Sequence, residues 1–536
     1  MGMFTRRKMA EATKDESYKL LSTTSLDDNI EKIKTLLKDC DDIVYKDFNV
    51  GETQKLKLAL VFTDGLVDKP FINASIMADL MIHAREVPPD APKLIEDIYE
   101  LIRYGTIPSP ELKDINNLDD AVLAILTGDT VLLMDGIETI IVIGTKGWPS
   151  RGVSEPNTEA IIRGSREGFT ETFRFNTALV RRYIRDPRFK IKQMQLGRRS
   201  FTDLGVLYID DIAKPELVEE VKRRLKTIDI DTIMESGYIE ELIEDNPYSL
   251  FPQIKATERP DKVAAALFEG KVAILVDNTP FALIVPATFN SFFHATEDHY
   301  IRWIPATVLR MMRFLAGILS LITPALYIAV TSYHPGILPT ALVLSIAASR
   351  EGVPFPALIE ALILELTFEL IREAGVRLPS LIGGVVGIVG GLVIGQAAVE
   401  AGIVSPIMVI IVAVTAISSF SIPDYGFSNA FRLFRFMLIF ASAFLGLYGM
   451  VLGLLLMLGH LVRLKSFGTP YLSPFVSFTV SDLKDTMVRL PIFMMKNRPL
   501  GIANDKVRMV NNRQEIKQDS DPKNKGKGEA KDDKKQ

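Results

Sequence analysis

Apolar residues are distributed unevenly along the chain, because charge is dense before residue 303 and after residue 460 and sparse between them. Four long runs contain no Asp, Glu, Lys or Arg: 314–349, 378–399, 401–423 and 436–459. A helix needs about 20 apolar residues to cross the hydrocarbon core of a membrane, and each run reaches that length. We therefore predict a multi-pass helical membrane domain over 301–465, with four to six spans.

The first of these runs is interrupted by Tyr333-His334-Pro335-Gly336, so that residues 314–332 can span alone. The 13 residues of 337–349 are too few for a simple crossing. The segment 337–374 therefore spans, re-enters or lies flat on the membrane. Lys and Arg residues flank the domain on both sides, which places the N-terminal half and the C-terminal tail in the cytoplasm and requires an even number of crossings.

Residues 356–374 predict a helix with four carboxylates inside this membrane region: Glu360, Glu365, Glu369 and Glu373. The last three are spaced i, i+4, i+8 and share one face, whereas Glu360 lies off it. Carboxylates that face lipid are costly, so these must face water, protein or the membrane interface. An amphipathic helix at the membrane surface is one interpretation. The other is an acidic lining of a cation path, in which these four residues are the candidate pore or gating residues.

A glycine ridge follows in the next apolar run, at a constant spacing of four: Gly383, Gly387, Gly391 and Gly395. Overlapping GxxxG units let two helices approach closely, so the ridge predicts helix–helix packing. The lining of a narrow channel is the alternative.

The N-terminal half repeats one pattern at an offset of 142 residues. Residues 119–144 and 261–286 each show an apolar helix, a glycine turn, a strand, a two-residue turn and a second strand. Before both, an apolar strand ends in acidic residues and Lys-Pro opens a helix. We therefore predict two similar α/β subdomains, with copies at about 28–147 and 170–287.

The segment between the copies is a basic helical connector. An ion-pair network that joins the two copies or neighbouring subunits is one interpretation, and contact with anionic headgroups or an anionic effector is the other. Nucleic acid binding is not expected, because no recognisable reading motif accompanies the basic residues. The candidate subunit-contact residues are Arg163, Arg166, Arg174 and Arg181.

Composition adds mainly exclusions. The net charge of −4 is close to neutral, and Cys40 is the only cysteine, which excludes internal disulfides and multi-cysteine metal sites. Phosphate-loop, dinucleotide and nucleophile-elbow motifs are missing, so we expect neither an enzyme nor a cofactor or metal. The predicted division is an N-terminal tail 1–27, subdomain 28–147, connector 148–189, subdomain 190–300, membrane domain 301–465, cytoplasmic C-terminal segment 466–502 and disordered charged tail 503–536.

Four stretches resemble the A subunit of GerA-type spore germinant receptors: Arg151–Phe189, Ser349–Pro379, Gly395–Pro406 and Gly468–Phe475. The resemblance covers roughly residues 30–500. It implies two similar α/β subdomains followed by a membrane domain, located in the inner membrane of endospores. It also implies assembly with a permease-like B subunit and a lipoprotein C subunit.

The function that the resemblance implies is a subunit of a nutrient receptor that triggers spore germination, with A subunits that oligomerise into a ligand-gated cation channel. A non-conducting signalling or scaffold subunit of the same complex is one alternative. A secondary transporter is the other, although such folds usually contain inverted repeats, and this membrane region shows one broken segment without a second copy.

Overall fold

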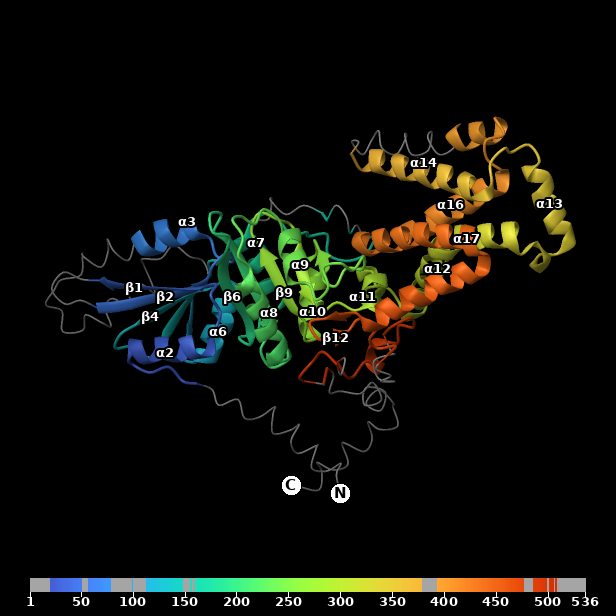
Figure 1. The fold of residues 1–536 in the computed structure, drawn as a ribbon. Helices are drawn as coiled ribbons and strands as arrows, with labels where there is room; N and C mark the ends of the chain where they lie inside the picture. Colours follow the sequence, from blue (N-terminus) through green and yellow to red (C-terminus); the bar gives the residue numbers. More distant parts are fainter. Residues whose placement is uncertain are drawn as a thin grey trace, which may run out of the picture.

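The computed structural model describes residues 20–50, 56–78, 99, 112–147, 155–156, 159, 161–377, 393–476, 485–498, 501–505 and 507–508. The molecule is elongated, with three blocks in a row (Figure 1). Two sheet-containing units come first along the chain, and a helical region follows at the other end. The structure thus contains two sheets in its N-terminal half and a helical region after them.

The first unit is a five-stranded sheet in the order β1-β2-β4-β5-β3, with antiparallel pairing throughout. Successive strand residues point to opposite faces. Val61 of β2 therefore packs with α2 and α6, whereas its neighbour Leu60 packs with the π-helical turn on the other face. The elements are α2 (Leu26–Leu36), β1 (Ile43–Val50), β2 (Leu56–Thr63), α3 (Lys69–Phe71), the π-helical turn η1 (Ile72–Met77), β3 (Leu112–Ile115), α6 (Leu118–Thr127), β4 (Thr130–Met134) and β5 (Ile140–Ile143).

The second unit repeats this topology with a sheet in the order β6-β7-β9-β10-β8. The predicted duplication is confirmed, but both sheets are antiparallel, so the units differ from parallel α/β layers. The elements are α7 (Phe173–Tyr183), β6 (Phe189–Leu196), β7 (Thr202–Ile209), α8 (Pro215–Thr227), α9 (Ser236–Ile243), β8 (Lys255–Thr257), α10 (Pro260–Phe268), β9 (Val272–Val276) and β10 (Ala282–Val285).

The two units also share individual hydrogen bonds. The backbone N–H at the start of α2 donates to Asp135 Oδ1 at 3.2 Å, and that at the start of α7 donates to Asp277 Oδ1 at 2.9 Å. The side-chain amide of Asn29 accepts from the backbone N–H of Thr23 and donates to the Thr23 carbonyl. Asn176 forms the same two hydrogen bonds with Thr170 in the second copy. Helix α7 therefore belongs to the second unit as the counterpart of α2, although it lies inside the predicted connector 148–189.

The helical region begins after the second sheet and contains most of the remaining described residues. Among them, α12 and α17 are the two helices long and apolar enough to cross a membrane, by length and composition. The elements are α11 (Phe289–Phe293), the 3-10 turn η3 (Thr296–His299), α12 (Trp303–Tyr333), the 3-10 turn η4 (Pro335–Ile337), α13 (Thr340–Arg350), α14 (Ala357–Arg377), a helical segment over 393–400, α16 (Pro406–Phe420), α17 (Tyr425–Arg463), the hairpin of β11 (Lys465–Ser466) and β12 (Thr469–Pro470), and the 3-10 turn η6 (Ile492–Met494).

Helix α17 is two antiparallel arms rather than one rod. Gly446 has φ 60° and ψ −143°, values outside the helical region. The ring of Phe251 lies 5.1 Å from that of Phe434 and 6.3 Å from that of His460. In a straight helix, residues 434 and 460 would stand about 39 Å apart, so both can approach one ring only if the chain reverses. The predicted single span 436–459 is therefore a hairpin that turns at Gly446.

The long helices of this region alternate in direction along the chain. The first arm of α17 runs alongside α12 in the same sense, because Arg435 reaches the Ser320 carbonyl and Gly446 lies against Tyr333. The second arm returns toward the soluble units, where His460 Nε2 lies 2.9 Å from Ser249 Oγ. The chain therefore enters and leaves this region on the side of the soluble units.

The predicted glycine ridge lies mostly outside the described residues: Gly383, Gly387 and Gly391 belong to the part that is not described. Gly395 lies in the helical segment 393–400, and a Cβ built on it would stand 3.7 Å from Val409 Cγ1 on α16. At Gly395 the segment thus faces α16, and helix–helix packing of the ridge as a whole stays a prediction.

Candidate functional site

The carboxylates of α14 meet arginine side chains inside the helical region. Glu365 Oε2 lies 2.8 Å from Nη2 of Arg435 on the first arm of α17, and both residues are 1% exposed. Arg435 Nη1 also donates to the Ser320 carbonyl on α12 at 3.4 Å. Within the described part of the chain, Glu365 Oε1 and Arg435 Nε have no hydrogen-bond partner. The pair is therefore dry and incompletely satisfied.

One helical turn further along α14, Glu369 receives two guanidinium groups. Its Oε1 lies 2.5 Å from Nη1 of Arg432 and 2.5 Å from Nη2 of Arg372. Its Oε2 is buried and lacks a hydrogen-bond partner among the described residues. This carboxylate is more open than the first, with a side chain that is 28% exposed.

These contacts form an antiparallel ladder of two rungs, Glu365–Arg435 and Glu369–Arg432. Residues four apart on α14 and three apart on α17 share one face of each helix, so the rungs are stacked. The order of the rungs requires α14 to run opposite to the first arm of α17. We call this set the Glu/Arg ladder.

Glu360 has a different environment from the ladder. It is fully buried, and its Oε1 lies 3.0 Å from Arg350 Nη2 at the end of α13. The backbone N–H of Ser405, the N-cap of α16, donates to Glu360 Oε2 at 2.9 Å. A carboxylate at a helix N-terminus is favoured by the unpaired N–H groups there. Glu360 therefore joins three segments at the end of the region remote from the soluble units.

Glu373, the last member of the predicted stripe, is paired with Arg377 at 2.6 Å, and both side chains are more than half exposed. The structure thus divides the four predicted pore residues. Glu360 and Glu365 lie in the protein interior, Glu369 is partly covered, and Glu373 is open. The protein interior, rather than the membrane surface or an open acidic path, surrounds the two buried carboxylates in this chain.

Arg432 and Arg435, the arginines of the ladder, were not identified from the sequence as candidate site residues. Their spacing of three residues matches one helical face. A stripe of carboxylates on one apolar helix and of arginines on another was the available signal. Spacing identifies a face but not the partner helix, so the pairing itself needed the structure.

The connector arginines divide into buried and exposed groups. Arg181 is fully buried and forms a bidentate ion pair with Asp42 of the first unit, with Nη2–Oδ1 at 2.8 Å and Nε–Oδ2 at 3.1 Å. Arg174 lies 3.6 Å from Asp64, also in the first unit. These two ion pairs join the two copies within one chain. Arg163 and Arg166 are exposed and stay candidates for subunit contact.

A second buried charge cluster holds the start of α12. Arg310 is fully buried, with Nε 3.0 Å from Asp298 Oδ2 of η3 and Nη1 2.6 Å from Asp485 Oδ1 of the C-terminal segment. Arg313 adds a contact of 2.8 Å to Asp298. We call this set the α12 base. It fastens the first long helix to the soluble units and to the C-terminal segment.

A domain made of two copies of one sheet-containing unit, joined to long apolar helices that bury paired charges, defines the class: a protein with a duplicated α/β domain and an apolar helical region. Residues 31–500 match the family described as Bacillus/Clostridium GerA spore germination protein. The chain belongs to this family.

Named relatives agree with this assignment. Spore germination protein KA of Bacillus subtilis (strain 168) is 43% identical over 490 residues, which cover 91% of this chain and 89% of that protein. Spore germination protein GerLA of Bacillus cereus is 45% identical over 443 residues, which cover 83% and 89%. The crystal structure of the N-terminal domain of the A subunit of the Bacillus megaterium spore germinant receptor GerK3 is 34% identical and covers 50% of this chain and 97% of that one, with a TM-score of 0.38.

Proposed function

We propose that this chain is the A subunit of a nutrient germinant receptor and that its helical region oligomerises in the spore inner membrane into a ligand-gated cation channel. Membership of a spore germination family supports the receptor role. In this proposal the permease-like B subunit and the lipoprotein C subunit are its partners. The role is non-enzymatic.

The proposed topology uses six passes: α12, α14, the segment that ends at residue 400, α16 and the two arms of α17. Alternating helix directions support it, and so does the return of the second arm to the soluble units. An even number of passes keeps the soluble units and the C-terminal segment together on the cytoplasmic side. Arg432 and Arg435 then lie within the membrane as ladder partners.

The observation that carries the channel proposal is the Glu/Arg ladder. Charged side chains inside a membrane are expensive and usually mark ion pathways or moving parts. Separating α14 from the first arm of α17 would leave Glu365 without its arginine and would leave Glu369 with only Arg372 of its own helix. Carboxylates freed in this way attract cations. In the paired state each carboxylate is neutralised by arginine. The ladder therefore supports a gate that exchanges arginine partners for water and cations.

The test compares spores whose A subunit carries Glu365→Gln, Glu369→Gln or Glu373→Gln. Potassium release after nutrient addition is followed with an ion electrode, and A-subunit abundance is measured by immunoblot. We expect the first two variants to slow release at normal abundance. Glu373→Gln is the matched control, because its exposed pair lies on the same helix one turn further along. Release at the wild-type rate in both ladder variants would contradict the proposal.

A non-conducting signalling subunit is the second candidate, and one observation favours it. Each buried carboxylate of α14 already has an arginine within this chain, which is what a permanently closed structural ladder requires. Conductance of the purified chain in a planar bilayer separates the two candidates. Cation currents that Glu365→Gln alters support the channel, whereas a silent bilayer with correctly assembled protein supports the signalling role.

A further inference from the structure

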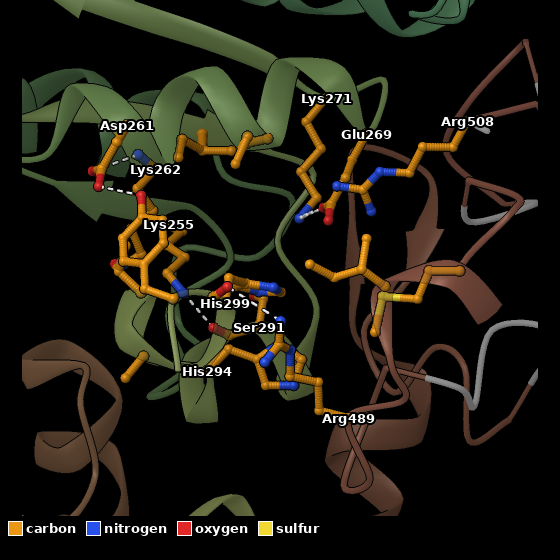
Figure 2. A pocket seen from close by; sticks show the side chains of 18 residues that line it. Lys255, Asp261, Lys262, Glu269, Lys271, Ser291, His294, His299, Arg489 and Arg508 are labelled. Atoms are coloured by element: carbon orange, nitrogen blue, oxygen red, sulfur yellow. Dashed lines mark hydrogen bonds and ion pairs between the residues drawn. The ribbon is translucent and has the colours of Figure 1, made fainter. Parts of the chain in front are cut away.

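A cavity of about 320 Å³ lies in the soluble part of the molecule, between α10, the segment from α11 to η3, and the C-terminal segment. Five cationic side chains, two carboxylates and two histidines line it. Figure 2 shows Lys255 and Lys262 on one side, Lys271 and Arg508 on the other, and Arg489 reaching the same region as His299. The lining therefore contains more cations than carboxylates.

Lys255 of β8 enters this cavity without a carboxylate partner. The residue is buried, and its ammonium donates a hydrogen bond to the Ser291 carbonyl. Among the described residues, no carboxylate lies within ion-pair distance of it, and Asp424 and Glu159 act on it electrostatically from further away. Burial lowers the pKa of the Lys255 ammonium well below its usual value, and the neighbouring Lys262 adds to this effect. A charge placed here without a counterion is costly.

Arg489 approaches from the C-terminal segment and is also buried. Its Nη1 donates to the Ile301 carbonyl at 2.6 Å and its Nη2 to the His299 carbonyl at 3.1 Å. Its Nε is buried and has no hydrogen-bond partner in the described part of the chain. Backbone carbonyls satisfy part of the guanidinium but supply no negative charge.

The two carboxylates of the lining are already engaged. Asp261 lies 2.7 Å from Arg259 Nη2 and accepts the Tyr300 hydroxyl at 2.5 Å. Glu269 lies 3.2 Å from Lys271. Neither contact reaches Lys255, which is left with a carbonyl oxygen as its hydrogen-bond acceptor.

We propose that this cavity binds a phosphate-class anion, held by Lys255 from the second unit and Arg489 from the C-terminal segment. Bound there, the anion supplies a negative charge in direct contact with both side chains, and charge-assisted hydrogen bonds form with each of them. The volume leaves room for an organic body against apolar wall residues such as Ile284 and Ile492. A free phosphate ester and an anionic lipid headgroup share this chemistry. Occupancy would tie the C-terminal segment to the second unit.

The test uses the purified full chain in detergent and radiolabelled inorganic phosphate in equilibrium dialysis at fixed ionic strength. We expect saturable binding by the wild type and binding weakened at least about tenfold in Lys255→Met, the size of a lost hydrogen bond to a charged group. Lys57→Met is the matched control, because that lysine is exposed in the first unit and should bind phosphate as the wild type does.

Thermal unfolding separates an anion site from a structural lysine. Removing an unpaired buried ammonium should leave Tm unchanged or raised in the absence of phosphate, while phosphate no longer raises Tm in Lys255→Met. A lowered Tm with unchanged phosphate binding would overturn the proposal.

The same variants are compared in nanodiscs of phosphatidylglycerol and of phosphatidylcholine. Lys255-dependent preference for phosphatidylglycerol without phosphate binding identifies the headgroup as the source, and binding of neither anion by the wild type refutes the site.

Discussion

The Glu/Arg ladder makes a quantitative prediction about the helical region. Replacing Arg435 by Met leaves the Glu365 carboxylate buried at 1% exposure without its partner. Breaking a buried ion pair from one side costs about 3–5 kcal/mol, whereas replacing both partners with apolar residues is often neutral or stabilising. A loss of that size changes a folding equilibrium by roughly two to four orders of magnitude.

The assay is thermal unfolding of the purified full chain in detergent, followed by the helical signal in circular dichroism. With about 2–4 °C per kcal/mol for a region of this size, Arg435→Met should lower Tm by roughly 6–20 °C. The double variant Glu365→Met/Arg435→Met should recover most of this loss. Arg377→Met is the control, because its exposed pair with Glu373 is worth about 0–1 kcal/mol. A double variant as unstable as the sum of the two single variants would refute the reasoning.

Two further predictions concern the soluble part and the α17 hairpin. Burial, together with Glu244 and Asp424, raises the pKa of Glu240 from 4.5 to about 8. The folded state thus holds this proton more tightly, and the carboxyl lowers stability as pH rises from about 4.5 to 8. The urea midpoint of Glu240→Gln should exceed that of the wild type by more at pH 8.5 than at pH 5. An equal difference at both pH values would contradict this prediction. A Cβ built on Gly449 would lie 2.1 Å from the Ala441 carbonyl oxygen. Gly449→Ala should therefore destabilise the hairpin by about 1–3 kcal/mol in the same urea assay, and Gly459→Ala, which meets open space, should not.

The duplicated units could be predicted because the turns of both contain residue types that favour a hairpin turn. Asp135-Gly136 and Asp277-Asn278 follow matching apolar strands, and Gly136 and Asn278 both adopt positive φ in the structure. Local backbone preference and strand alternation therefore suffice to place the hairpins. The antiparallel register was not accessible in this way, because it depends on pairing between strands far apart in the chain.

The helical region shows where such reasoning fails. An uncharged run over 436–459 fits one crossing by length, and only the reversal at Gly446 makes it two arms. That reversal is stabilised by close approach of the arms, a tertiary effect. The acidic stripe could be assigned to one face of α14. Glu365 and Arg435 are 70 residues apart, however, and residue spacing within one helix does not identify the helix that supplies the ion-pair partner.

The α12 base has a mechanical consequence. Arg310 is held by Asp298, which precedes the helix, and by Asp485, which follows the last arm of α17. The start of the helical region and the segment that follows its last helix are thus joined through Arg310, and Arg489 adds hydrogen bonds to the carbonyls of Ile301 and His299. A protein cut before residue 485 would keep the contacts of Arg310 and Arg313 with Asp298 and lose the one with Asp485, so α12 would be coupled less tightly to the rest of the chain.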